Sequence, residues 1–134
     1  MMEFNKDLIE KTLEDLYKIM RSITGAGNRE TLNYIKRKFL PNSELKSIKS
    51  GSKVFDWVVP PEWNIKDAYI KNKFGDKIID FQENYLNVVS YSMPIETKIE
   101  KDELLKKIYS LKKYPDLIPY RTSYYKKDWG FCCK

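Results

Sequence analysis

The chain has 134 residues, of which 42% are hydrophobic and 14% aromatic, and its formal net charge is +6 from 25 basic and 19 acidic side chains. This length fits one domain, or one domain with an appendage, and the apolar content excludes global disorder because it can offset the chain entropy. The basic residues are interleaved with acids along the whole sequence, which favours a solvated surface over a nucleic-acid-binding face.

Histidine is absent from the sequence, and the two cysteines, Cys132 and Cys133, are adjacent. Without histidine the chain contains no Ser-His-Asp or Cys-His nucleophile and lacks the commonest ligand of catalytic zinc, so we expect no catalytic residue, metal ligand or cofactor within it. A disulfide bond between adjacent cysteines would not close a loop of the chain. The absence of a disulfide framework favours a reducing, cytoplasmic location. No apolar run is long enough to span a bilayer, and we expect no membrane partner.

The first predicted elements are two helices. Apolar residues between positions 5 and 20 recur at helical spacing, namely Ile9, Leu13, Leu16, Tyr17 and Met20. The turn-forming segment 22–27 ends this helix, and Asn28 is the expected N-cap of a second helix that Pro41 stops. The apolar residues of the second helix are Leu32, Ile35 and Phe39. Residues 1–42 are therefore predicted to form an N-terminal helical hairpin.

After residue 42 the pattern changes to period two with β-branched residues, which is typical of strands. The expected strands cover 45–49, 54–59, 67–71, 77–81 and 86–91, and 72–76 is the loop of a β-hairpin. A third helix is expected from Asp102 to Leu111, followed by an extended tail. Residues 43–134 are thus predicted to be a mostly antiparallel β-rich domain with one further helix, and the chain as a whole belongs to the α+β class.

The loop 21–28, RSITGAGN, has two glycines, two hydroxyls and a helix start after it, a combination that can hold an anion. It lacks the GxxxxGK[ST] spacing of a nucleotide-binding loop, and no predicted strand precedes it. A simple helix–helix turn is the favoured interpretation.

Two further groups have a structural and a functional interpretation. Asp56 and Glu62 are paired carboxylates of the kind that acid–base catalysis uses, but hydrogen-bonded structural acids are favoured, with Trp57 and Trp63 packing as core. In the tail segment RTSYY, at 121–125, an arginine beside aromatic rings could clamp a carboxylate or phosphate, or stack on single-stranded nucleic acid. Core aromatics among surface lysines are the favoured interpretation of this tail.

Four segments together resemble a known family: LYKIMRSITGAGNRETLNYIKRKF, SGSKVFDWVVPPEWNIKDAYIKN, NVVSYSMP and IPYRTSYYKKDWGFC. In this order they resemble the N-terminal part of bacterial aminopeptidase-like proteins associated with polysaccharide biosynthesis. The resemblance implies a longer parent with an α/β zinc-exopeptidase-like domain, an inserted β-rich domain and a C-terminal winged-helix domain. Residues 1–42 would belong to the exopeptidase domain and 43–134 would begin the inserted domain.

The resemblance also implies that the metal-binding histidines and acids of the family lie outside these 134 residues, so zinc is expected only in the full-length parent. The chain would be scaffold and one wall of a cleft for a peptide or amino-sugar-type substrate, with the downstream part of the same polypeptide as its partner. The residues expected on this wall are Arg21, Ser22, Thr24, Arg121, Thr122, Tyr124 and Tyr125. Trp129, Phe131, Cys132 and Cys133 would be partly uncovered where they pack on that downstream part.

The alternative is a stand-alone basic module that binds an anionic polymer, either polysaccharide or nucleic acid. Because the positive charge is dispersed, such binding is expected to be weak and sensitive to salt, and nucleic acid is the less favoured ligand.

Overall fold

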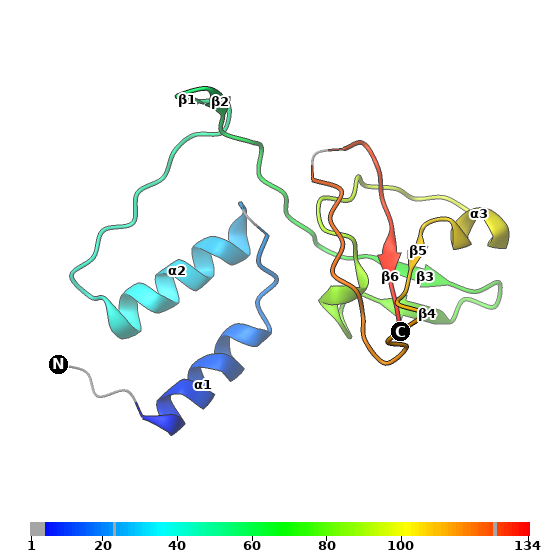
Figure 1. Ribbon diagram of the computed structural model, residues 1–134, viewed down its shortest axis with the longest axis horizontal. Helices are drawn as coiled ribbons and strands as arrows, with labels where there is room; N and C mark the ends of the chain where they lie inside the picture. The colour runs from blue at the N-terminus through cyan, green and yellow to red at the C-terminus, as the bar shows by residue number, and fades with distance from the viewer. Residues whose placement is uncertain (1–4, 23, 125) are drawn as a thin grey trace. The chain divides into compact units, whose positions relative to one another are not determined.

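The computed structural model of the chain describes residues 5–22, 24–124 and 126–134 (Figure 1). These residues form two compact units, Met1–Asn64 and Ile65–Lys134, called unit 1 and unit 2 below. Helices and short strands are combined, which confirms the expected α+β class. Within the described ranges, no helix has both the length and the apolar character needed to cross a membrane.

Unit 1 begins with the two expected helices, α1 (Lys6–Tyr17) and α2 (Ala26–Phe39). The Asn5 side chain caps α1 by accepting a hydrogen bond from the Leu8 amide at 2.9 Å. The Tyr34 hydroxyl of α2 donates to Asp15 of α1 at 2.8 Å, so a polar contact joins the two helices.

The start of α2 differs from the expected one, because the helix begins at Ala26 and its N-cap is Gly25 rather than Asn28. Gly25 has a φ of 144°, a conformation that favours glycine, and a Cβ there would lie 2.7 Å from the Trp63 carbonyl oxygen. The sequence pattern missed this start because the helix has no side-chain cap of its own.

The segment after α2 is less regular than its alternating pattern suggested. Residues 45–49 form no strand, and the expected single strand 54–59 is instead a small antiparallel hairpin of β1 (Lys53–Val54) and β2 (Trp57–Val58). The hairpin folds back at Phe55 and Asp56. Alternation alone predicts which face a residue occupies but not whether a partner strand lies within reach.

Unit 2 contains the expected hairpin of β3 (Tyr69–Lys71) and β4 (Lys77–Asp80), paired antiparallel. The Asn72 side chain organises its loop by accepting hydrogen bonds from the amides of Phe74 and Asp76 at 2.9 and 3.0 Å.

The remaining elements of unit 2 are shorter than expected. The expected strand 86–91 begins with the 3₁₀ helix η1 (Tyr85–Asn87), and α3 (Lys101–Leu105) stops well before Leu111. A parallel pair, β5 (Ile108–Tyr109) with β6 (Phe131–Cys132), follows. The described strands thus form three separate two-stranded ladders, of which two are antiparallel and one is parallel.

The apolar core lies in unit 2, where residues 88–91 meet the last strand. The Val89 amide donates to the Gly130 carbonyl at 3.0 Å, and the Phe131 amide donates to the Lys107 carbonyl at 2.9 Å. Phe131 is 8% exposed and Cys132 is 0% exposed, so the expectation of an uncovered tail is wrong for these two residues. Their strand is completed by contacts inside unit 2, whereas Trp129 is only partly buried.

Among its described residues, unit 1 has no comparable core. Its buried described residues are Gly25 and Thr31, and α1 buries none. Trp57 is 52% exposed, so the expected packing of Trp57 as core is wrong, while Trp63 is partly buried. The expected division of the parent between residues 42 and 43 stays a prediction, since the two units describe this chain alone and part after Asn64.

We predict that Phe131→Ala destabilises unit 2 by about 3–5 kcal/mol, because it removes a buried ring and leaves a cavity. The ring also makes an edge contact with Trp129, at 6.4 Å between centroids. Urea unfolding followed by circular dichroism measures the loss. Phe74→Ala is the matched control: Phe74 is 78% exposed, and a change within about 0.5 kcal/mol is expected there. Equal losses in the two variants would contradict the assigned core.

Candidate functional site

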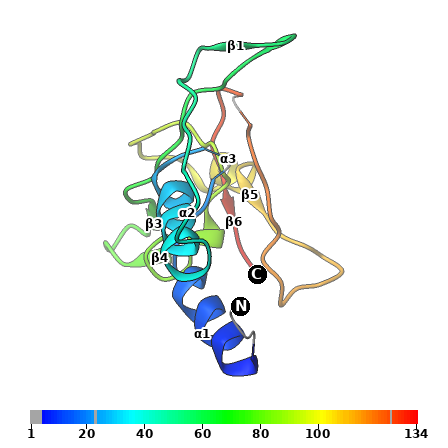
Figure 2. The same cartoon turned by 90° about the vertical axis from the view of Figure 1, so that its left-hand side faces the viewer.

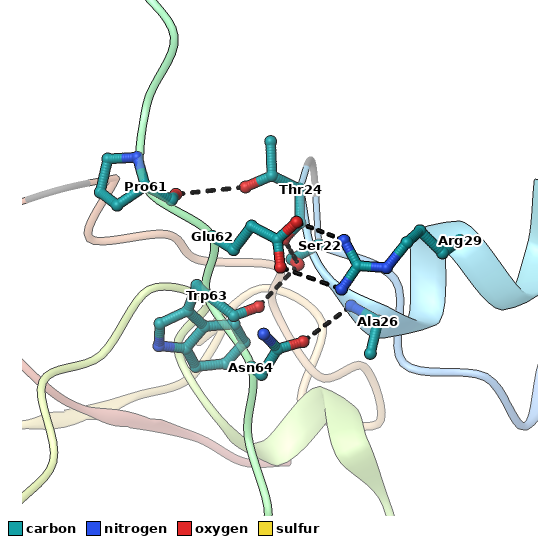
Figure 3. Close-up of polar contacts among 8 residues, drawn as sticks. All are labelled: Ser22, Thr24, Ala26, Arg29, Pro61, Glu62, Trp63 and Asn64. Atoms are coloured by element: carbon teal, nitrogen blue, oxygen red, sulfur yellow. Dashed lines mark hydrogen bonds and ion pairs between the residues drawn. The ribbon is translucent and has the colours of Figure 1, made fainter. Parts of the chain in front are cut away.

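The connection before α2 and the segment Pro61–Asn64 are held together by polar contacts within unit 1 (Figure 3). The Thr24 hydroxyl donates to the Pro61 carbonyl at 3.3 Å, and the Ser22 hydroxyl donates to the Trp63 carbonyl at 3.1 Å. We call this group the α2 entry cluster. It consists of Ser22, Thr24, Ala26, Arg29, Pro61, Glu62, Trp63 and Asn64.

Asn64 supplies the cap that α2 lacks locally. Its side-chain oxygen accepts a hydrogen bond from the amide of Ala26, the first residue of the helix, at 2.7 Å. The first amides of a helix have no partner within the helix, so a side chain from a distant segment can take the place of an N-cap. The chain itself therefore uses the amide that an anion would need, which favours the helix–helix turn interpretation of this loop.

Arg29 and Glu62 form a two-pronged ion pair at the same place. Arg29 Nη1 donates to Glu62 Oε1, and Nη2 donates to Oε2 at 3.0 Å. The hydrogen bonds from Arg29 hold the pKa of the Glu62 carboxyl below its ordinary value, and those to Glu62 raise the pKa of Arg29. A carboxylate stabilised in its ionised form is a poor general acid at neutral pH, so the structural interpretation of Glu62 is supported. Asp56 lies in the exposed loop of the β1–β2 hairpin, outside the cluster.

The three expected wall residues of unit 1 lie at this connection, but their polar groups are engaged within the chain. Arg21 donates from Nη1 to the Leu16 carbonyl at 2.6 Å, near the end of α1. Ser22 and Thr24 use their hydroxyls to hold the returning segment. Their contacts are structural, and their place on a cleft wall stays a prediction.

The other expected wall residues lie along one segment of unit 2. The Arg121 guanidinium carbon lies 4.6 Å from the centre of the Tyr109 ring, a cation–π contact. Thr122 forms an isolated parallel bridge with Ser90, and the ring of Tyr124 packs edge-on against Tyr91 at 5.8 Å between centroids. Tyr125 lies outside the described residues. Because the two sets belong to different units, a wall shared between them stays a prediction.

The sequence did not single out Arg29 or Asn64, which are central to the α2 entry cluster. Their partners lie 33 and 38 residues away along the chain, beyond the reach of any local pattern. The one available signal was a glycine at the position where a helix usually carries a capping side chain.

Across residues 5–22, 24–124 and 126–134, no group of three or more Cys, Asp or Glu side chains is arranged to hold a metal ion. The described part of the chain therefore offers no set of residues to assign as ligands.

The chain belongs to the family described as "Domain of unknown function (DUF2172)", whose model matches residues 62–134. The chain is also 52% identical, over 123 residues, to a Clostridium acetobutylicum protein named "Putative polysaccharide biosynthesis protein with aminopeptidase-like domain". The match covers 92% of this chain and 28% of that protein. This finding confirms the resemblance to the N-terminal part of aminopeptidase-like proteins.

A solved structure shows the same relationship. The crystal structure of a "putative peptidase" from Clostridium acetobutylicum superposes on this chain with a TM-score of 0.87 at 49% identity. The superposition covers 92% of this chain and 29% of that one. The chain thus spans less than a third of the length of either relative.

We predict that Asn64→Ala loosens the start of α2, because it leaves the Ala26 amide without its acceptor. Loss of a capping oxygen costs about 1 kcal/mol. Amide hydrogen exchange followed by NMR should show reduced protection at Ala26. The control is Asn33→Ala, at an exposed position in the middle of the same helix. Alanine favours helix there, so the protection of the Ala26 amide should be kept or increased. Unchanged exchange at Ala26 in the Asn64 variant would contradict the capping role.

A second prediction concerns pH. Because the Glu62 pKa in the folded chain is below its ordinary value of 4.5, the ion pair contributes stability above that pH and loses it as the pH falls through the folded pKa. The difference in unfolding free energy between the wild type and Glu62→Gln should therefore shrink below pH about 4.5. Unfolding curves collected from pH 7 to pH 3 measure this difference. Glu30→Gln, on α2 beside Arg29, is the control, and a difference that grew on acidification would contradict the assignment.

Proposed function

We propose that the chain is the non-catalytic N-terminal portion of a zinc-dependent aminopeptidase-like protein, in which it acts as scaffold and contributes one wall of the substrate cleft. The observation that carries the proposal is the 52% identity over 123 residues to a protein with an aminopeptidase-like domain, of which the chain covers 28%. The downstream remainder of such a polypeptide is the proposed partner.

The uneven burial of the chain supports a scaffold role. Unit 2 has its own core, but α1 in unit 1 leaves Ile9, Leu13 and Tyr17 between 51% and 64% exposed. These residues recur at a spacing of four and lie on one face of the helix. An apolar helix face of this kind is normally buried against another element, so unit 1 is suited to pack on further polypeptide.

Arg121 is the wall candidate best suited to contact substrate. Its side chain is exposed, and its stacking on Tyr109 orients the planar guanidinium. An oriented guanidinium can form two parallel hydrogen bonds to the carboxylate of a peptide, which suits a peptide or amino-sugar-type substrate. Ser22 and Thr24 would support the wall indirectly, since they position the segment 61–63.

Zinc in this proposal belongs to the part of the longer protein outside this chain. The work of this chain is therefore to orient substrate and to stabilise the neighbouring structure.

Charge pairing argues against a stand-alone basic module. Basic side chains in both units pair with acids, as Lys11 does with Asp15 and Lys107 with Asp128. Such pairing leaves less positive charge available for an anionic polymer.

The test is a hybrid protein, in which this chain replaces the matching 28% of the Clostridium acetobutylicum relative. We expect the hybrid to fold with a melting temperature close to that of the relative and to match it in zinc content and in hydrolysis of aminoacyl nitroanilides. A deletion lacking the segment should fail to fold or lose these properties. A deletion variant that equals the intact relative in all three measurements would contradict the scaffold role.

A substitution on the apolar face of α1 tests whether this face packs on the remainder of the relative in the same hybrid. Leu13→Asp places a charge on the apolar stripe, so it should lower the melting temperature of the hybrid. In the isolated 134-residue chain the same change should have little effect, because Leu13 is 64% exposed there. Leu13→Met, which keeps the apolar contact, is the control.

A further inference from the structure

The hairpin of β1 and β2 places a phenylalanine at a backbone position that favours glycine. Val54 pairs with Trp57, which leaves Phe55 and Asp56 as a two-residue loop. Phe55 has a φ of 52°, and Asp56 is not among the positive-φ residues. A positive φ at the first loop residue alone is the pattern of a type II′ turn, in which glycine is usual at that residue. A bulky side chain there is strained.

The same phenylalanine is almost fully solvated. Phe55 is 92% exposed, and its neighbours Trp57 and Val58 are 52% and 57% exposed. The hairpin projects from α1 and α2 on an extended stretch of chain, as both ribbon views show (Figures 1 and 2). The tip thus combines backbone strain with exposed apolar surface, and neither feature stabilises the chain as it stands.

We propose that the β1–β2 hairpin is an anchor that inserts the Phe55 ring into an apolar pocket on the remainder of a longer polypeptide, outside this chain. This inference rests on the proposed function. In such a complex the burial of the ring would offset the strained turn, and Trp57 and Val58 would cover the rim of the pocket.

The remainder of the polypeptide is the occupant that the observations favour. The chain covers only 28% of the relative that it matches, so the greater part of the surface available in such a protein lies outside it. Unit 1, which carries the hairpin, also buries only Gly25 and Thr31 among its described residues. A covalently linked partner is present at a high effective concentration, which suits an anchor of one aromatic ring.

Charge argues against a membrane as the occupant. The hairpin and the stretch leading to it carry three basic and two acidic side chains over residues 44–59: Lys46, Lys49, Lys53, Glu44 and Asp56. The excess of one positive charge is well short of the clusters of basic residues by which segments bind anionic lipid.

The experiment compares Phe55→Gly with Phe74→Gly in the isolated chain and in the hybrid protein. In the isolated chain, Phe55→Gly should keep or raise the melting temperature, because glycine relieves the strained turn. In the hybrid it should lower the melting temperature and increase proteolytic cleavage of the hairpin on the order of tenfold, as loss of one buried aromatic side chain implies. Phe74→Gly, at the exposed tip of the β3–β4 hairpin, should not cause this reversal between the two proteins.

A photo-crosslinker gives a direct second readout. With p-benzoylphenylalanine at position 55, irradiation of the hybrid should join the hairpin to residues supplied by the relative, which mass spectrometry identifies. Crosslinks confined to this chain, or a Phe55→Gly effect of the same sign in both proteins, would overturn the anchor.

Other outcomes identify other occupants. Loss of a dimer of the 134-residue chain on Phe55→Gly, measured by sedimentation, would assign the tip to a second copy and overturn the proposal. If the chain bound to anionic vesicles and Phe55→Gly abolished that binding, the hairpin tip would be assigned to a membrane, and the proposal would also be overturned. A hybrid that fails to fold with the wild-type chain would count against the proposed function and this inference together, whereas a folded hybrid insensitive to Phe55→Gly would overturn the anchor alone.

Discussion

The return of residues 61–64 to the start of α2 is the contact on which unit 1 depends. Each of the four residues contributes a polar group, two to the connection before α2 and two to the first turn of the helix (Figure 3). Gly25 allows the close approach, because any Cβ there would meet the Trp63 carbonyl. Polar contacts therefore hold this part of unit 1 together, whereas unit 2 is held together by an apolar core.

The two units are stabilised by different physics. Unit 2 buries apolar side chains between residues 88–91 and β6, so its stability comes mainly from water-excluded packing. Unit 1 depends on a helix cap, an ion pair and hydroxyl contacts that are all at least partly exposed, and exposed polar contacts each contribute little. A segment stabilised in this way is well suited to gain its remaining stability from a neighbouring surface.

The family match agrees with this division. The family model begins at residue 62, close to the boundary between the units after Asn64, and it includes all of unit 2. The residues before it carry the exposed α1 face and the β1–β2 hairpin. Under the proposed function, unit 2 is therefore a self-contained module, whereas unit 1 is the part that engages the rest of the longer protein.

The sequence by itself determined the local elements that a short-range pattern specifies. The two helices follow from apolar spacing, and the β3–β4 hairpin follows from two short runs with isoleucine and aromatic residues around a glycine-containing loop. The absence of histidine and the resemblance to aminopeptidase-like proteins were likewise readable from the residues alone. Each of these conclusions needs only neighbours in sequence, or the order of whole motifs.

Only the tertiary structure decided the contacts that join distant residues. The apolar, β-branched run over 54–59 could not distinguish one strand from a tight hairpin, because both are built from residues that favour extended backbone. The cap on Ala26 comes from Asn64, and the burial of Phe131 comes from residues 88–91, so neither is encoded near the residue that it affects. Local pattern reports which conformations a segment can adopt, whereas partners far along the chain select among them.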